Sequence, residues 1–486
     1  MTAREAALKA LGEFRRNKKR PLKSLYEQKA KSSISPIDAA LAEQIINGVL
    51  QNMAYCDYIL SCFSTFSIQK IEPRVLDILR ISIYQILFLS KIPYSAAVNE
   101  GVTLATKSAN KKAAGFVNAV LRRIADSAAD GSVPSLEIED ICERLSVKYS
   151  HPLWLVQKFC EAFGHDGTEA LLTSNNDDSS PITAQVNTLL TNTEELIASL
   201  AADGITASMH ETFDDCVDFR CPGGIERLAA FKKGLFYVQD ASSHCAVLAA
   251  SPCKGDYVID GCAAPGGKSF AAAVLMRNTG RIEARDISAA KLNAVSEGAR
   301  RLGIGIIEVL VCDAVGADSN ANVAAGGGVA ADGVVIATAS ADGSVAAVQT
   351  DSARTGGTVL ANASAALADV VLADVPCSGF GVIRKKPEIR YKTREEIAGL
   401  PEIQKKILHN LSSYVKPGGT LIYSTCTLLN EENEEVVESF LRERKDFALA
   451  GFSLPGFGDV PDGMAKLLPH VHHTDGFFIC KMQRKA

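Results

Sequence analysis

In the second half of the chain, short apolar runs rich in β-branched residues alternate with longer segments of helical periodicity. Five runs have the character of buried strands, at residues 257–260, 281–286, 306–313, 370–374 and 420–423. Helices are expected from about residue 268, and over 289–302, 404–414 and 431–441. Repeated strand–helix units predict a doubly wound parallel sheet, which binds its ligands at the carboxyl ends of the strands.

The chain has 486 residues, more than one domain usually holds, and its pattern changes along its length. Residues 1–127 show helical spacing and few strand signals, so an all-α domain is expected there. Residues 138–235 have a mixed pattern, with one helix over 146–163, which predicts a small α+β middle domain. Residues 236–486 then hold the α/β domain.

A segment of small residues interrupts the α/β pattern at about residues 316–366. It separates two strands that such a fold joins by a short connection. We interpret it as an insertion. Because its small side chains offer little apolar surface to bury, we expect it to lie outside the sheet. Within it, residues 334–339 and 345–348 could pair as a small hairpin.

Overall composition is that of a soluble globular protein, with 47% hydrophobic and 22% charged residues. The thirteen cysteines lack the short regular spacing of a disulfide framework or a zinc site, so no metal is expected and a reducing, cytoplasmic location fits. The N-terminus lacks the apolar region of a signal peptide. Charged and polar residues break the most apolar early stretch, 78–92, so no membrane association is predicted. A monomer is expected.

Charge is distributed unevenly along the chain. Residues 1–128 carry 19 Lys and Arg against 10 Asp and Glu, although the whole chain has a net charge of −5. One basic run contains Arg15, Arg16, Lys18, Lys19, Arg20 and Lys23. The asymmetry favours a polyanion-binding module at the N-terminus. A solvated helix face would explain the run equally well.

A glycine-rich turn directly follows the first strand of the α/β domain. Its residues are Cys262, Ala263, Ala264, Pro265, Gly266, Gly267 and Lys268. This is not the G-x-G-x-x-G dinucleotide fingerprint. Glycines at 266 and 267 allow a ligand to approach the backbone closely, and the helix that follows offers free N–H groups.

Aspartates close three successive strands: Asp260, Asp286 and Asp313. Asp286 could accept hydrogen bonds from ribose hydroxyls, and Asp313 could accept one from an adenine amino group. Together they describe a nucleoside pocket into which S-adenosylmethionine fits. A single aspartate of this kind is more often a cap or turn residue, but the recurrence at three strand ends favours the pocket.

Two cysteines follow the fourth and fifth strands, Cys377 after Asp374-Val375-Pro376 and Cys426 after Ser424-Thr425. A thiol can add to C6 of a pyrimidine and make C5 nucleophilic enough to accept a methyl group. Asp374 could hydrogen-bond a ring nitrogen, and Lys268 could lower a thiol pKa or contact the substrate. Ten further cysteines are interpreted as small buried hydrophobic residues: Cys56, Cys62, Cys142, Cys160, Cys216, Cys221, Cys245, Cys253, Cys312 and Cys480.

These motifs, with residues 381–391 and 423–426, resemble those of the Nol/Nop/Sun (NSUN) family of RNA cytosine-C5 methyltransferases, above all its bacterial small-subunit rRNA enzymes. Residues 84–87 and 118–123 make the first 127 residues resemble the antitermination factor NusB. The resemblance covers nearly the whole chain except the insertion. It implies a Rossmann-like S-adenosylmethionine-dependent methyltransferase domain, preceded by a NusB-like helical domain and the middle domain.

The resemblance also implies roles for individual residues. Cys426 would be the nucleophile, Cys377 would assist breakdown of the covalent adduct, and Asp374 would contact the target base and the cofactor region. S-adenosylmethionine would be held by residues 262–268 with Asp286, Asp313 and Asp374. The implied partner is 16S rRNA or a small-subunit assembly particle. Its phosphates would be bound by the N-terminal helices and by Arg384, Lys385, Lys386, Arg390 and Lys392.

Two residues depart from the expected apolar pattern of the pocket, Gly261 and Arg285. Two other functions also remain open. A DNA cytosine-C5 methyltransferase uses a Pro-Cys nucleophile too, although the second cysteine and the NusB-like part argue against it. The second alternative is a non-catalytic RNA-binding assembly factor with a vestigial pocket. The intact Lys268, Asp374, Cys377 and Cys426 argue against this alternative.

Overall fold

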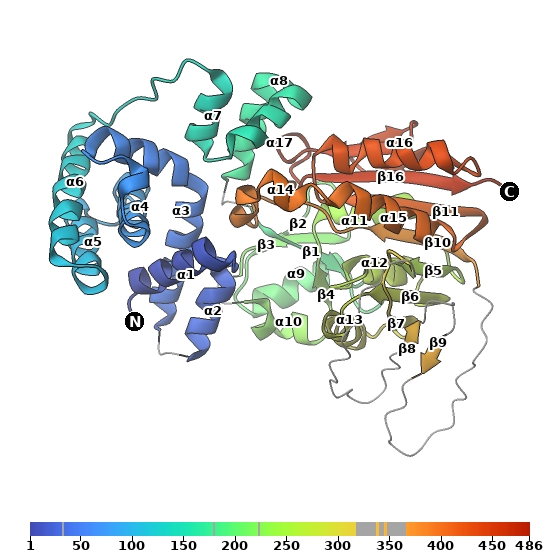
Figure 1. Ribbon diagram of the computed structural model, residues 1–486. Helices are drawn as coiled ribbons and strands as arrows, with labels where there is room; N and C mark the ends of the chain where they lie inside the picture. Colours follow the sequence, from blue (N-terminus) through green and yellow to red (C-terminus); the bar gives the residue numbers. More distant parts are fainter. Residues whose placement is uncertain (32–33, 178–179, 222–223, 317–336, 340–344, 348–365) are drawn as a thin grey trace. The chain divides into compact units, whose positions relative to one another are not determined.

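The computed structural model describes residues 1–31, 34–177, 180–221, 224–316, 337–339, 345–347 and 366–486 (Figure 1). The chain forms two compact units. The first contains residues 1–178 together with 383–392, and the second contains residues 179–382 together with 393–486.

The first unit is helical, as expected from the sequence. Its first six α-helices are α1 (Ala3–Asn17), α2 (Pro21–Lys31), α3 (Pro36–Phe63), α4 (Pro73–Phe88), α5 (Tyr94–Ser108) and α6 (Lys111–Asp130), with a 3-10 turn at Ile68–Lys70. Side-chain caps start three of them, because the hydroxyls of Thr2 and Ser35 and the amide oxygen of Asn110 accept hydrogen bonds from the first turns. Isoleucines of α3 and α4, such as Ile45, Ile46 and Ile78, are fully buried in the core.

Two more helices, α7 (Ile141–Tyr149) and α8 (Leu153–Asn175), complete the first unit. The expectation of one helix over 146–163 is wrong, because Ser150 has a left-handed φ of 55° and Pro152 precedes the next helix. A second break lies within α8, where Gly164 has φ 68° and ψ 178°. The sequence assigned these helices to the middle domain, whereas they group with the N-terminal helices.

Residues 383–392 belong to the first unit although they are distant from it in sequence. Their 3-10 turn, Pro387–Tyr391, carries the fully buried Arg390. The Arg390 guanidinium donates to the side-chain oxygen of Asn176 at 2.7 Å and to the Tyr149 carbonyl at 3.2 Å, and the Tyr391 hydroxyl donates to the Leu50 carbonyl at 2.6 Å. The expected phosphate-binding role of Arg390 is therefore wrong, since the side chain is fully buried and both terminal nitrogens donate to groups within the first unit.

The second unit begins with a small antiparallel sheet, in agreement with the α+β pattern of this part of the sequence. Its strands are β1 (Ile182–Val186), β2 (Ala207–Met209), β3 (Cys216–Phe219) and β4 (Phe236–Val238), in the order β2-β3-β1-β4. The helices α9 (Thr193–Ala202) and α10 (Ala229–Lys232) and a 3-10 turn at Ile225–Arg227 connect them.

A larger sheet forms the centre of the second unit. Its strands run in the order β12-β16-β11-β10-β5-β6-β7-β8-β9, and β15 pairs with β16. Neighbours from β11 to β8 pair in parallel, while β16 is antiparallel to β11. The bounds are β5 (Tyr257–Asp260), β6 (Arg281–Asp286), β7 (Ile307–Val311), β8 (Ala337–Ala339), β9 (Val345–Ala347), β10 (Ala368–Asp374), β11 (Val415–Thr425), β12 (Phe447–Leu449), β15 (Met464–Leu467) and β16 (Phe477–Arg484).

Helices cover both faces of this sheet, which confirms the predicted doubly wound architecture. Alternate strand residues enter two different cores, Val258 with Leu372 on one face and Ile259 with Val371 on the other. The first core contains α11 (Ala241–Ala250), α12 (Gly267–Leu275) and α13 (Ala289–Leu302), and the second contains α15 (Leu400–Ser412) and α16 (Glu434–Glu443). Remaining elements are α14 (Arg394–Ile397), α17 (Pro469–His472), a 3-10 turn at Asn430–Glu432 and the hairpin β13 (Phe452–Leu454) with β14 (Gly458–Val460).

Only two pieces of the expected insertion are described, β8 and β9. They pair with each other as an antiparallel hairpin, as the sequence suggested. However, β8 also pairs in parallel with β7, so the expectation that the segment lies outside the sheet is wrong for β8. The remaining residues of that prediction lie outside the described part of the chain. Among the described helices, none combines the length and the apolarity that a membrane crossing needs.

Candidate active site

Strand order in the large sheet creates a topological switch point beside β5. The chain leaves β5 toward β6 and β7 on one side, and later returns through β10 and β11 on the other. Parallel pairing aligns Asp374 at the end of β10 with Ser424 of β11. Ligands of such sheets bind outside the carboxyl ends of the strands at this point, and the motifs singled out in the sequence lie there.

Lys268 and Asp374 form the charged centre of the site. The Lys268 ammonium lies 2.6 Å from one carboxylate oxygen of Asp374 and donates to the Ser243 hydroxyl at 2.8 Å. The other Asp374 oxygen accepts a hydrogen bond from the Ser424 hydroxyl at 2.8 Å. Lys268 is only 8% exposed. These contacts hold the Asp374 carboxylate in one orientation and keep a cation beside it.

The two predicted catalytic thiols face each other. The Sγ atoms of Cys377 and Cys426 lie 3.2 Å apart, although 48 residues separate them in sequence. The hydrogen bond with Cys426 and then burial raise the pKa of Cys377 well above its ordinary value, and the nearby carboxylates of Glu432 and Asp374 add to this effect. Cys377 therefore retains its proton at neutral pH in this arrangement and can donate it to the Cys426 sulfur.

Glu432 anchors the loop that carries Cys377. Its carboxylate accepts hydrogen bonds from the Ser378 backbone N–H at 2.9 Å and from the Gln404 side chain at 2.8 Å. Gln404 also donates to the Pro376 carbonyl at 3.0 Å. Glu432 and Gln404 are both buried, so these bonds are shielded from water. Neither residue stands out in the sequence, because both regions show only helical periodicity.

A second set of contacts holds the Cys426 loop. The Asn433 side chain accepts from the Thr425 hydroxyl at 2.6 Å and donates to the Thr427 carbonyl at 3.1 Å. The Thr427 and Ser378 hydroxyls lie 2.7 Å apart and link the two cysteine loops directly. The two thiols are thus positioned by a continuous buried network. Its one sequence signal is the Asn430-Glu431-Glu432-Asn433 run that follows Cys426 closely.

The three aspartates predicted for the nucleoside pocket also lie at this edge. Asp260 and Asp286 end β5 and β6, and Asp313 follows the end of β7 by two residues. Asp286 accepts from the Ser288 N–H at 2.9 Å and Asp313 from the Val315 N–H at 2.9 Å. Both are therefore turn-forming residues as well as candidate ligand contacts.

Asp260 lies in a different environment from the other two. It is buried, and one carboxylate oxygen accepts from the Ser269 hydroxyl at 2.7 Å. Its other oxygen has no hydrogen-bond partner among the described residues. Burial raises the pKa of Asp260 to about 6, while Ser269 and Lys268 act in the opposite direction.

The glycine-rich turn connects β5 to α12. Gly266 has φ 111°, and a β-carbon there would lie 2.5 Å from the Phe270 ring, so only glycine fits this turn without a shift. Burial raises the pKa of the Cys262 thiol above its ordinary value, with nearby aspartates adding to the effect. The Cys262 thiol therefore keeps its proton, which makes it a poor nucleophile.

The two departures from the expected apolar pattern are accommodated by their surroundings. A β-carbon at Gly261 would lie 2.3 Å from Leu411, which packs against this position. Arg285 is buried, forms an ion pair with Glu283 at 2.6 Å and lies over the Tyr414 ring at 4.2 Å. The charge of Arg285 is thus satisfied within the protein.

Comparison with known families matches all three parts of the chain. The model described as 16S rRNA methyltransferase RsmB/F matches residues 247–336 and 342–483. The NusB family model matches residues 1–126, and a ferredoxin-like domain model of RsmF/B-like methyltransferases matches residues 151–226. A curated relative from Bacillus subtilis, named probable ribosomal RNA small subunit methyltransferase B, is 35% identical, with 100% of this chain and 99% of the relative covered. The chain belongs to the RsmB/F methyltransferase family.

Other RsmB/F relatives and solved structures agree with this assignment. A Synechocystis protein with the same name is 30% identical, and 93% of each chain is covered. A crystal structure of PH0851 matches with a TM-score of 0.73 and 25% identity, covering 100% of this chain and 99% of that one. A methyltransferase homolog from Pyrococcus horikoshii shares the fold, with a TM-score of 0.53 over 71% of this chain and 100% of that one at 24% identity. The predicted NusB-like and methyltransferase folds are confirmed.

Proposed function

We propose that the protein transfers a methyl group from S-adenosylmethionine to C5 of a cytosine in 16S rRNA, through a covalent bond between a cysteine and C6 of the base. The observation that carries this proposal is the pair of thiols 3.2 Å apart, beside the Lys268–Asp374 ion pair at the switch point of the sheet. The names of the curated relatives support ribosomal RNA of the small subunit as the substrate.

The residues of the site fit S-adenosylmethionine. The glycine turn at 266–267 leaves the backbone open at the start of α12, and Asp286 and Asp313 present acceptors at the ends of neighbouring strands. The buried oxygen of Asp260 that lacks a partner among the described residues is an acceptor that a ligand N–H could satisfy. When bound, S-adenosylmethionine supplies an electrophilic methyl group.

Cys426 is the proposed nucleophile. Its thiolate forms a bond to C6 of the cytosine, which makes C5 nucleophilic. Cys377 keeps its proton, and its thiol can donate a hydrogen bond to the Cys426 sulfur 3.2 Å away. Asp374, fixed by Lys268 and Ser424, is positioned to hydrogen-bond the base.

The second thiol is proposed to complete the cycle. After C5 is methylated, the C5 proton leaves to a base and the bond between C6 and Cys426 breaks, which restores the thiolate and the aromatic ring. Cys377 assists this breakdown, since it is the group held next to the sulfur that leaves. The target base must first leave any stack, which costs about a few kcal/mol.

RNA would be bound through its phosphates by the basic first unit. Of the basic run, Lys19 lies 3.2 Å from Glu13 and 2.7 Å from Glu27, and Arg15 lies 3.1 Å from Asp77. The exposed members of the run are therefore better candidates for phosphate contacts, and these include Arg16, Arg20 and Lys23.

Methylation in vitro tests this function. The purified protein would be incubated with methyl-labelled S-adenosylmethionine and either naked 16S rRNA, an undermodified small-subunit particle or a DNA copy of the rRNA. We expect 5-methylcytosine in the RNA after nuclease digestion and mass spectrometry, and none in the DNA. Label in a different nucleoside, in the DNA alone or in no substrate would contradict the proposal.

A further inference from the structure

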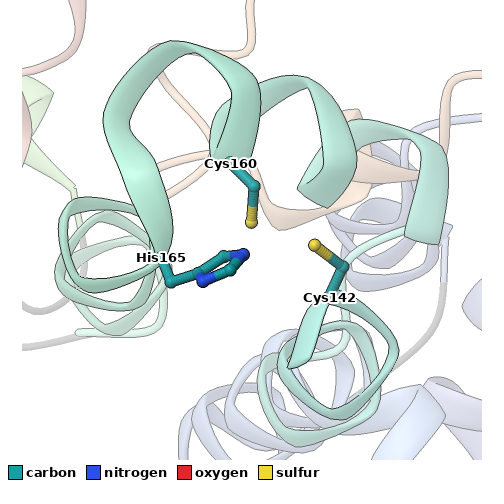
Figure 2. A group of neighbouring side chains, drawn as sticks. All are labelled: Cys142, Cys160 and His165. Atoms are coloured by element: carbon teal, nitrogen blue, oxygen red, sulfur yellow. The ribbon is translucent and has the colours of Figure 1, made fainter. Parts of the chain in front are cut away.

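A cluster of side chains that could bind a metal ion lies in the first unit, far in sequence from the motifs of the candidate active site. Cys142 belongs to the first turn of α7, and Cys160 and His165 belong to α8. Their sulfur atoms and an imidazole nitrogen all lie within 4.8 Å of one another. Figure 2 shows the three side chains pointing toward a common centre.

The break in α8 at Gly164 brings the histidine to this centre. In a continuous helix, residues five apart such as 160 and 165 would lie on different faces, because side chains meet only at spacings of three and four. Gly164 has φ 68° and ψ 178°, which interrupts the helix between them. A side chain at that φ is strained, so glycine at this position is what permits the cluster.

The donor set and spacing suit a borderline-soft cation. Zinc bonds of about 2.3 Å to sulfur at tetrahedral angles place two sulfur atoms about 3.8 Å apart, so small side-chain movements within the observed 4.8 Å would bring three ligands to one ion. Two thiolates would balance the charge of a divalent ion. Asp140 and Glu161 lie close enough to Cys142 to act on it through their charge, and they add negative potential for a cation.

The cluster is accessible to an ion from solvent. Cys142 and Cys160 are partly buried, and His165 is exposed. His165 also lines a hollow of about 660 Å³ together with residues of α7 such as Arg144 and Lys148.

We propose that Cys142, Cys160 and His165 bind a zinc ion, with water in the fourth position, and that this ion ties α7 to α8. The sequence pattern gave no such indication, because C-x17-C-x4-H lacks the short spacings of known zinc motifs and we expected no metal. The ion would act on stability. α7 has nine residues, too few for an independently stable helix, so a bond to α8 would contribute to its folding.

Metal titration of the full-length, reduced protein tests the proposal. Zn²⁺ would be titrated against a chromophoric chelator, and Co²⁺ would be used to report ligand type through its thiolate charge-transfer and tetrahedral d–d absorption. We expect one tight site in the wild type, weakened by more than about 100-fold in Cys142→Ser and Cys160→Ser. Zn²⁺ should raise the Tm of the wild type but not of these variants.

Three controls make the result specific. His165→Ala changes an exposed side chain and leaves no cavity, so a loss of affinity there reports lost ligation rather than unfolding. Cys62→Ser removes an exposed thiol of the same unit and should bind zinc like the wild type. Cys377→Ser/Cys426→Ser removes the other facing thiol pair and should retain the site as well.

Two outcomes would overturn the proposal. One is equal zinc affinity in the wild type, Cys142→Ser and His165→Ala, or a site that is lost only in Cys377→Ser/Cys426→Ser. The other is a reduced protein that binds no zinc while mass spectrometry of the non-reduced protein finds a Cys142–Cys160 disulfide. In that case the two thiols would form a redox pair instead.

Discussion

The molecule holds two pairs of facing cysteines, and their surroundings differ. Cys377 and Cys426 follow adjacent parallel strands, and a buried network through Glu432 and Asn433 fixes their loops. Cys142 and Cys160 come from two helices, and their third neighbour is the exposed His165. The Lys268–Asp374 ion pair lies beside Cys377 and Cys426. Among the described residues, Cys142 and Cys160 have no lysine–aspartate ion pair beside them.

The comparison shows that the chemistry of a thiol pair depends on what surrounds it. A rigid pair beside an oriented carboxylate suits bond formation to a base, because reacting groups must be held in place. A solvent-accessible pair with an imidazole suits a metal ion, whose ligands can adjust to it.

Replacing the proposed nucleophile should have the largest effect on methylation. Cys426→Ala should reduce the methylation rate by at least about four orders of magnitude, because Cys426 forms the bond to C6 in the proposed mechanism. Binding of S-adenosylmethionine, measured by calorimetry, should remain near that of the wild type. Cys253→Ala, which alters an exposed thiol elsewhere, is the matched control and should retain its rate. Full turnover by Cys426→Ala would move the role to Cys377.

Replacing Cys377 should have a different result from replacing Cys426. Cys377→Ala should still form the covalent adduct but fail to resolve it, so protein remains attached to RNA. A denaturing gel should show this band for Cys377→Ala and not for Cys426→Ala. The reverse pattern would mean that the two roles are exchanged.

Loss of the anchoring carboxylate should loosen the catalytic pair. In Glu432→Ala, the buried Ser378 N–H and the Gln404 side chain lose an acceptor, at about 1–3 kcal/mol each, so the free energy of unfolding should fall by about 3–5 kcal/mol. Urea denaturation measures this change. Glu435→Ala removes an exposed carboxylate of α16, three residues along the chain, and should change stability by less than about 0.5 kcal/mol. Equal changes in the free energy of unfolding for the two variants would mean that the hydrogen bonds to Glu432 do not stabilise the protein.

The smallest expected effect is a pH dependence that arises at the carboxyl end of β5. The pKa of Asp260 is raised to about 6 in the folded protein, above its ordinary value of 3.8, so its proton is bound more tightly there than in the unfolded chain. Its stabilising contribution is therefore complete below pH 3.8 and is lost as the pH rises through 6. The loss amounts to about 2–3 kcal/mol.

Asp260→Asn should remove this dependence while keeping an acceptor for Ser269. The variant should gain stability relative to the wild type as the pH rises from 4 to 7, measured by urea denaturation at each pH. Asp462→Asn, at an exposed site, is the control for the loss of one negative charge. Parallel pH profiles for Asp260→Asn and the wild type would show that Asp260 does not titrate in this range.

The sequence by itself determined most of the candidate site at the carboxyl ends of the strands. Strand periodicity is local, so the ends of β5, β6 and β10 at Asp260, Asp286 and Asp374 could be located without a structure. Since parallel strands place their carboxyl ends at one edge, the same pattern predicted a ligand site at this edge, and the structure places Lys268, Asp374, Cys377 and Cys426 there. The position of β8 could not be predicted in this way. Its segment consists of small residues, whose pattern does not indicate whether the segment joins the sheet.

Only the tertiary structure decided which polar residues support the site and which never reach solvent. Glu432 and Gln404 lie on helical segments whose sequence shows no reason to face Cys377. Arg390 was predicted to bind phosphate with its basic neighbours at 384–392, yet its guanidinium is buried among carbonyls of distant helices. Cys142, Cys160 and His165 meet because Gly164 breaks a helix. In each case the partner is set by packing between segments far apart in the chain, and local periodicity carries no information about that packing.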